Sequence, residues 1–168
     1  MSKPETEEHF AVADKMLSRQ LQWIAAADGK VAPVFAIDAA MLGVLAVLVP
    51  PIGQWSISAA IAASLSGIPL VGSVACLALA AFPRLNGPKG SITFFGGITN
   101  LSEGDYLKRM SLGINQHLIE DVYRQVYRNA EIAAKKFGFI KWAMILMFGS
   151  VPFWLIAVWL MYPVKFGQ

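Results

Sequence analysis

The segment 139–162 reads FIKWAMILMFGSVPFWLIAVWLMY, and its only charged residue is Lys141. At about 1.5 Å per residue, a helix of this length crosses a hydrocarbon core of roughly 30 Å. Two earlier runs have the same character, residues 31–49 (VAPVFAIDAAMLGVLAVLV) and residues 57–82 (ISAAIAASLSGIPLVGSVACLALAAF). Pro50 and Pro51 end the first of these, and Pro83 ends the second. We therefore expect three transmembrane helices in an all-α integral membrane protein.

Composition leads to the same class. The 168 residues are 56% hydrophobic and only 15% charged, with a mean hydropathy of +0.53, whereas soluble domains carry about a quarter charged residues. The charges are missing in blocks, which is typical of spanning segments. The net charge of +3 is too small and too scattered to predict a nucleic-acid polymer as partner. The expected partner is the lipid bilayer.

The remaining segments are helix-forming and polar. Residues 1–30 predict an amphipathic helix, because apolar side chains recur at three- and four-residue steps: Phe10, Ala13, Leu17, Leu21 and Ile24. In residues 83–138, Ser102 predicts a helix start, and a long helix from about Asn115 runs into the third span. Residues 91–98 fit either a strand-like segment or a helix start. We expect residues 1–30 and 83–138 to form a cytosolic helical module, and residues 163–168 to be an extracytoplasmic tail.

Lysine and arginine predict the orientation. Four lie before the first span, and nine lie in the second loop or at its border with the third span. The first connection has none, and the C-terminal tail has only Lys165. By the positive-inside rule, the N-terminus and the long loop are cytoplasmic.

The sequence holds no nucleophile–base pair, paired carboxylates or phosphate loop, so we expect neither an enzyme nor a cofactor. His9, His117 and the lone Cys76 lack metal-site spacing, so no metal is expected. Asp38 is an acid inside a span, for which structural hydrogen bonding and a functional ionisable site both stay open. Small residues recur at four-residue spacing in the second span and predict a homo-oligomer interface: Ala59, Ala63 and Gly67.

Several motifs resemble those of one known family. The segment 21–30 (LQWIAAADGK) runs straight into a span and looks like the AD-x-K signature of the Pycsar effector transmembrane family, named for the pyrimidine cyclase system for antiphage resistance. Residues 82–84 (FPR), the segment 91–98 (SITFFGGI) and the pair Tyr106-Leu107 follow in order. The long helix adds matching residues: Asp121, Gln125, Val126, Tyr127, Asn129, Lys136 and Phe137. The resemblance covers about residues 17–162, and Pro33 departs from it.

This resemblance implies a role. Members are similar to effectors of bacterial antiphage defence, in which a cyclase makes cyclic CMP or cyclic UMP on infection. The effector responds in the inner membrane and impairs it, which stops phage spread by abortive infection. Two alternatives stay open: an effector gated by a cyclic oligonucleotide, and a non-enzymatic scaffold or channel subunit that binds a partner protein.

A cyclic nucleotide needs a cation for its phosphate and an aromatic face for its base. Candidate ligand residues on the long helix and the aromatic segment are Tyr123, Arg124, Tyr127, Arg128, Lys135, Lys136, Phe94 and Phe95. Asp28, Lys30 and Arg84 are candidates at the membrane surface. The alternative is that Arg128 only pairs with Glu131, that the tyrosines only pack the module, and that Asp28 and Lys30 are ordinary interfacial charges.

Overall fold

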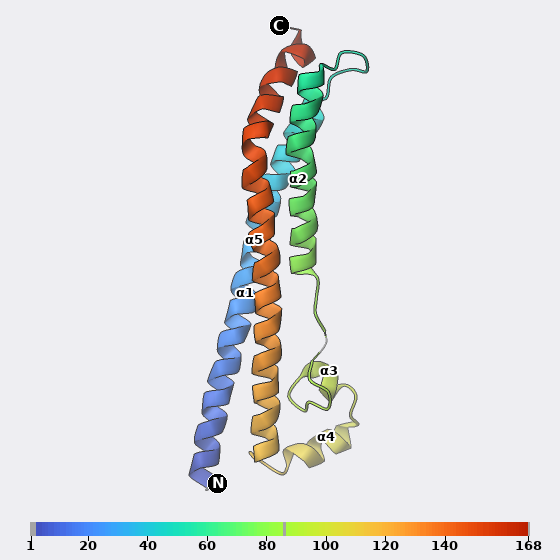
Figure 1. Ribbon diagram of the computed structural model, residues 1–168. Helices are drawn as coiled ribbons and strands as arrows, with labels where there is room; N and C mark the ends of the chain where they lie inside the picture. The colour runs from blue at the N-terminus through green and yellow to red at the C-terminus, as the bar shows by residue number, and fades with distance from the viewer. Residues whose placement is uncertain (1–2, 86, 168) are drawn as a thin grey trace. The chain divides into compact units, whose positions relative to one another are not determined.

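The computed structural model describes residues 3–85 and 87–167. Within this part of the chain every regular element is a helix, which confirms the all-α prediction (Figure 1). The helices are α1 (Lys3–Leu48), α2 (Ile57–Ala81), α3 (Phe95–Ile98), α4 (Glu103–Met110) and α5 (Gln116–Phe166). Three of them, α1, α2 and α5, are long and apolar enough to cross a membrane, as predicted.

Two helices are longer than their spans. The amphipathic segment and the first span form one continuous helix, α1, which runs through Pro33. Helix α5 runs through Pro152 and Pro163 to Phe166, so the segment expected to be a tail is helical up to this residue. Two contacts hold this last turn: the Tyr162 and Phe166 rings lie 4.9 Å apart, and Lys165 Nζ donates to the Val49 carbonyl at 3.3 Å.

Side-chain caps begin the helices where the sequence predicts. The Ser56 hydroxyl accepts from Ala59 N at 3.2 Å to begin α2. The Ser102 hydroxyl accepts from Asp105 N at 3.1 Å to begin α4. Asn115 accepts from Leu118 N at 3.0 Å at the start of α5. The segment 91–98 is a turn followed by the one-turn helix α3, so the helical alternative holds there.

The chain forms two compact units. One joins the chain up to Ala26 with Pro83–Lys135, and we call it the polar unit. The other joins Ala27–Phe82 with the chain from Lys136 onwards, and we call it the membrane bundle. Helices α1 and α5 each contribute to both units.

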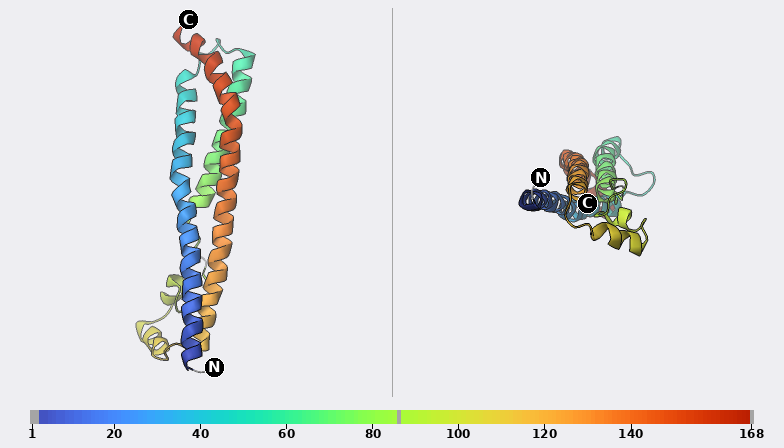
Figure 2. Two further views of the ribbon diagram at one scale, coloured as in Figure 1. Left: turned by 90° about the vertical axis from the view of Figure 1, so that its left-hand side faces the viewer. Right: turned by 90° about the horizontal axis from the view of Figure 1, so that it is seen from below.

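In the membrane bundle, α1 and α5 run parallel. Hydrogen bonds join Asp28 to Lys136, Met41 to Trp154 and Val49 to Lys165, so partners advance together along both helices. Helix α2 runs the opposite way, because its C-terminal end packs where the bundle's part of α1 begins: Ala80 shares a buried cluster with Ala27 and Ile140. Figure 2 shows the three helices of the bundle side by side. Their apolar core includes Leu45, Leu70, Leu77, Ala143, Met147 and Ala157.

In the polar unit, the buried face of α1 matches the apolar stripe predicted from the sequence at every position but one. Ala13 is fully buried, and Phe10, Leu17 and Ile24 are partly buried, but Leu21 is 50% exposed. Leu21 lies four residues after Leu17, whereas the partly buried Gln20 lies three residues after it and takes the inner position. The stripe was otherwise located correctly.

Candidate functional site

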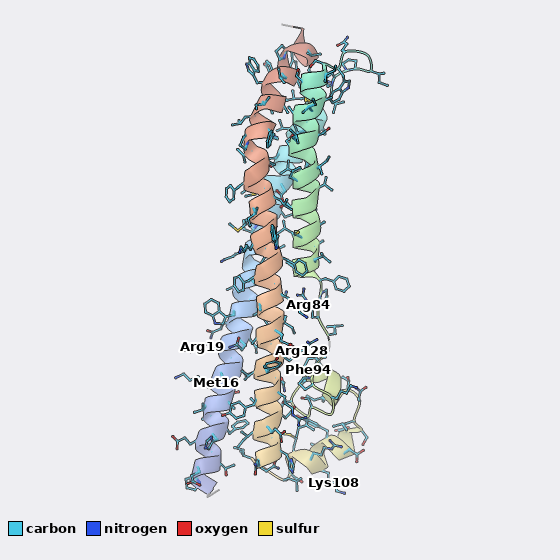
Figure 3. The ribbon with its side chains drawn as sticks, viewed as in Figure 1. Met16, Arg19, Arg84, Phe94, Lys108 and Arg128 are labelled. Atoms are coloured by element: carbon cyan, nitrogen blue, oxygen red, sulfur yellow. The ribbon has the colours of Figure 1, made fainter. Side chains whose placement is uncertain are left out.

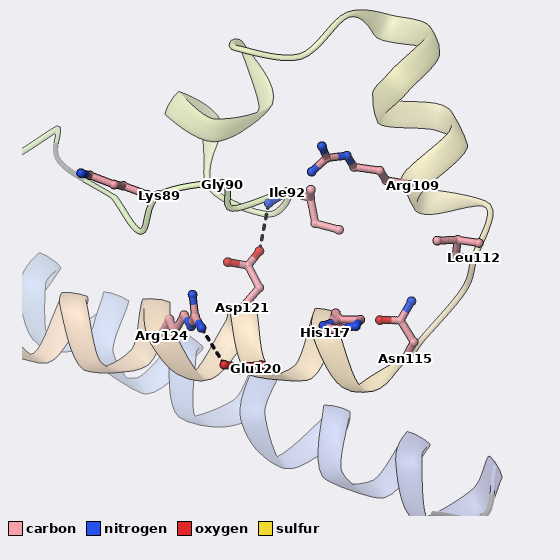
Figure 4. Close-up of a pocket in the computed structure, with 10 residues that line it drawn as sticks. All are labelled: Lys89, Gly90, Ile92, Arg109, Leu112, Asn115, His117, Glu120, Asp121 and Arg124. Atoms are coloured by element: carbon pink, nitrogen blue, oxygen red, sulfur yellow. Dashed lines mark hydrogen bonds and ion pairs between the residues drawn. The ribbon is translucent and has the colours of Figure 1, made fainter.

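The polar unit contains a cavity of about 340 Å³. Its walls come from the turn at residues 89–92, the end of α4 and the first turns of α5 (Figure 4). The lining residues are Lys89, Gly90, Ile92, Arg109, Leu112, Asn115, His117, Glu120, Asp121 and Arg124. The volume falls at the lower end of the range of small-molecule sites, roughly 300–1,000 Å³.

Three cations line this cavity, each from a different element: Lys89 from the turn, Arg109 from α4 and Arg124 from α5. Across the described residues, Lys89 and Arg109 have no ion-pair partner. Arg124 Nη2 lies 2.7 Å from Glu120 Oε1, but both side chains are more than half exposed. Exposed pairs are worth about 0–1 kcal/mol, so an incoming anion can compete for Arg124. The cavity lining therefore carries three cations beside two carboxylates, those of Glu120 and Asp121.

Asp121 fixes the turn that forms one wall. Its Oδ2 accepts from the Ser91 hydroxyl at 2.9 Å, Ile92 N at 3.0 Å and the Thr93 hydroxyl at 2.8 Å. Gln125 Nε2 donates to the same two hydroxyls, those of Thr93 and Ser91. These donors all bind Oδ2, so one carboxylate oxygen of α5 holds three consecutive residues of the turn in place.

Gly97 lets the chain fold back against this turn. A Cβ atom at this position would lie 2.0 Å from the Ser91 carbonyl oxygen, closer than any real contact. Only glycine allows this approach of two backbone segments. The wall carrying Lys89 and Ile92 is therefore held both by α5 and by the start of α3.

The structure places only one predicted ligand residue, Arg124, in the cavity. Arg128 Nη1 lies 2.9 Å from Glu131 Oε2, which is the alternative considered from the sequence. Figure 3 shows Arg128 on α5, Arg84 beyond the end of α2, and Phe94 beside the short helix α3. The Phe94 and Phe95 ring centroids lie 4.5 Å apart. Tyr123, Tyr127 and Lys135 are exposed on α5.

The other predicted residues belong to the membrane bundle. Lys136 is buried and forms an ion pair with Asp28. Lys30 Nζ lies 5.2 Å from the centroid of the Phe137 ring, a cation–π contact. The predicted ligand set is therefore divided between the two units rather than gathered in one cluster.

Sequence reasoning missed Lys89, Arg109 and His117 as cavity residues. Lys89 and Arg109 were used only for orientation, and His117 was considered only as a metal ligand. The available signal was that each basic residue lies beside a turn, at Gly90 and near Gly113. Within the described residues, no group of three or more metal-ligating side chains occurs.

The structure also shows where the residues singled out in the first and second spans lie. Asp38 is fully buried, and its Oδ2 accepts from the Ser73 hydroxyl at 2.6 Å. Ala59 is buried in the core of the bundle itself. Ala63 and Gly67 line an apolar groove of about 590 Å³ on α2, together with Trp55, Ala60, Ser64, Ile68 and Val71.

Three apolar helices combined with a polar helical unit define a multi-span membrane protein that carries its own candidate ligand cavity. A family model described as the Pycsar effector protein domain matches residues 12–162, and the chain belongs to this family. Comparisons with curated proteins and with solved structures give no match. The family makes this chain a membrane effector of antiphage defence, and it points to a cyclic nucleotide signal as partner.

Proposed function

We propose that this effector is gated by a cyclic pyrimidine mononucleotide, cyclic CMP or cyclic UMP, bound in the cavity of the polar unit. Binding then impairs the inner membrane of the infected cell. The observation that carries the proposal is that Lys89, Arg109 and Arg124 all line one small cavity in a chain of this family. Charge-assisted hydrogen bonds from such groups are the usual means of holding a phosphate.

The size of the cavity favours a mononucleotide. About 340 Å³ is enough for one base, one sugar and one phosphate. A cyclic oligonucleotide carries two or more bases, sugars and phosphates. His117 supplies a flat ring on which a base can stack, and Ile92 and Leu112 supply an apolar wall.

Helix α5 provides a route from the cavity to the membrane. Asp121 and Arg124 lie near its start, and the same helix continues without interruption to Phe166. A ligand that pulls Arg124 away from Glu120 changes the contacts of the first turns of α5. Long helices transmit such changes by shifting or rotating as rigid bodies. The orientation expected from lysine and arginine places the polar unit in the cytoplasm, where the cyclase product is made.

The direct test is binding of the purified full-length protein to cyclic CMP, cyclic UMP, cyclic AMP and a cyclic dinucleotide, measured by calorimetry. We expect a cyclic pyrimidine mononucleotide to bind best. Recovered nucleotide should be chemically unchanged, because we propose a receptor and not an enzyme. Binding of the cyclic dinucleotide alone would transfer the proposal to the oligonucleotide alternative, and binding of none would favour a scaffold or channel subunit.

A variant pair tests the cavity. Arg109→Ala combined with Arg124→Ala should weaken binding by at least about a hundred-fold, since each lost hydrogen bond to a charged group costs about 1.5–3 kcal/mol. It should also abolish nucleotide-triggered depolarisation of proteoliposomes, followed with a potential-sensitive dye. Arg128→Ala is the matched control, because Arg128 lies one turn further along α5, pairs with Glu131 and does not line the cavity. Equal loss in both variants would place the phosphate elsewhere.

A further inference from the structure

A second cationic groove lies in the membrane bundle, on α1 and α5. It has a volume of about 440 Å³. Lys30 and Lys141 line it together with apolar residues of α5, among them Phe137, Met144, Ile145 and Phe148. The apolar residues recur at three- and four-residue steps, so they follow one face of the helix away from the lysines. The groove therefore has a charged end and an apolar floor.

The charge at this end is not balanced within the bundle. Three ammonium groups gather where α1 and α5 begin their apolar runs: Lys30, Lys136 and Lys141. Asp28 pairs with Lys136, and this lysine is 8% exposed. In the described part of the chain, neither Lys30 nor Lys141 has a carboxylate partner. Two positive charges thus stay available where the apolar runs of α1 and α5 begin, which is where headgroups of a surrounding bilayer would lie.

We propose that this groove binds an anionic phospholipid. The lipid phosphate lies between the Lys30 and Lys141 ammonium groups, and one acyl chain follows Met144, Ile145 and Phe148. These three side chains are 37%, 48% and 60% exposed, so they present the surface that such a chain needs. The Lys30 ammonium lies 5.2 Å from the centroid of the Phe137 ring, and this cation–π contact holds it beside the groove. Basic pockets between transmembrane helices recognise anionic headgroups in this way.

This lipid site is independent of the nucleotide cavity, because its residues lie in the other unit. Its position has a consequence for gating. The groove begins directly after the residues where the polar unit ends, Ala26 and Lys135. A lipid bound there contacts α1 and α5 together, so it stabilises their packing in the membrane bundle by mass action, against any change that nucleotide binding drives.

Native mass spectrometry of the full-length protein without nucleotide tests the proposal. The measurement compares how much dioleoyl phosphatidylglycerol and how much dioleoyl phosphatidylcholine the protein retains. Each basic residue near a membrane surface adds about five-fold to anionic lipid binding, so we expect roughly a ten- to thirty-fold preference for phosphatidylglycerol. Lys30→Gln combined with Lys141→Gln should reduce this preference to about one. Lys30→Arg combined with Lys141→Arg should keep it, and so should Lys165→Gln, which alters a lysine at the opposite end of α5.

Two further arms make the test decisive. Ile145→Trp fills the apolar floor and keeps both lysines, and it should lower retention of both lipids. Glycerophosphoglycerol, the headgroup without acyl chains, should not compete at the concentrations at which the lipid binds. Competition by the headgroup alone, or by inorganic phosphate, would mean a site for free phosphate and would overturn the proposal. Retained preference in the double glutamine variant would overturn it as well.

Discussion

Asp38 on α1 and Ser73 on α2 form a fully buried polar contact between two helices of the membrane bundle. Both residues are fully buried, and one hydrogen bond of 2.6 Å joins them. Within the described residues, the second carboxyl oxygen of Asp38 has no hydrogen-bond partner. The Ser73 hydroxyl is therefore the one group that satisfies this acid in an apolar environment, where unsatisfied polar atoms are costly.

Removal of this hydroxyl tests how far the contact is structural. We expect Ser73→Ala to lower the free energy of unfolding in detergent by about 1–2 kcal/mol, because it leaves Asp38 without a donor. Asp38→Asn should unfold no more readily than the parent, since it keeps an acceptor for Ser73 and loses the acid. Ser66→Ala is the matched control: its hydroxyl is equally buried but donates to Ala63 O on its own helix. If Asp38→Asn keeps stability but loses depolarisation, the acid has a functional role.

At this scale the sequence identified the important residues but not their partners. Asp38 was singled out as an acid inside a span, yet Ser73 lies 35 residues further along the chain. Asp28 and Lys136 were both candidates, but their 108-residue separation hid their ion pair. Such pairs depend on which helix faces meet, and one sequence does not specify this.

The elements were predictable where local chemistry decides them. Proline, serine and asparagine at the helix ends indicated the bounds of α2 and α4 and the start of α5 to within a residue or two, but α5 runs four residues past its predicted end at Tyr162. The segment 91–98 was ambiguous, because its aromatic and β-branched residues favour a strand. Its conformation is set instead by Asp121, which gathers the Ser91 and Thr93 hydroxyls and the Ile92 amide from a distant part of the sequence. Tertiary contacts override local preference here.

Asp121→Ala should release this turn from α5. The variant leaves the Ile92 amide without its acceptor, and we expect a loss of about 1–3 kcal/mol in the stability of the polar unit. Hydrogen exchange at Ile92 should become faster, and nucleotide affinity should fall, because the wall carrying Lys89 is no longer fixed. Glu120→Ala is the neighbouring control, since its exposed pair with Arg124 contributes little to stability. Unchanged exchange at Ile92 in Asp121→Ala would contradict the role assigned to this acid.

For the whole molecule, the number of candidate spans followed from the sequence, because each of the three apolar runs holds at most one charged residue. The cavity could not be predicted from the sequence, because its residues come from a turn and two helices, and the packing of these elements leaves no periodic pattern in the sequence. Orientation follows from charge and is open to test.

We expect the polar unit to face the cytoplasm. In a Cys76→Ala background, a single cysteine at Gln54, in the exposed connection between α1 and α2, should react in intact cells with an impermeant maleimide. A single cysteine at Ser102, exposed at the start of α4, should react only after the inner membrane is permeabilised. The Cys76→Ala parent serves as the unlabelled control. Reaction at Ser102 in intact cells would reverse the orientation.

We expect copies of the protein to assemble through the groove on α2. Ala59 faces the core of its own bundle, but Ala63 and Gly67 line the groove, and a Cβ at Gly67 would meet no atom within 4 Å. Small side chains on an open face let the helix of a second copy approach closely. Ala63→Leu with Gly67→Leu should therefore shift the protein towards the monomer in light scattering, while its helix content stays the same. Val71→Leu, at the edge of the same groove, is the control because it adds little bulk. Unchanged mass for the double variant would show that copies do not meet through this face.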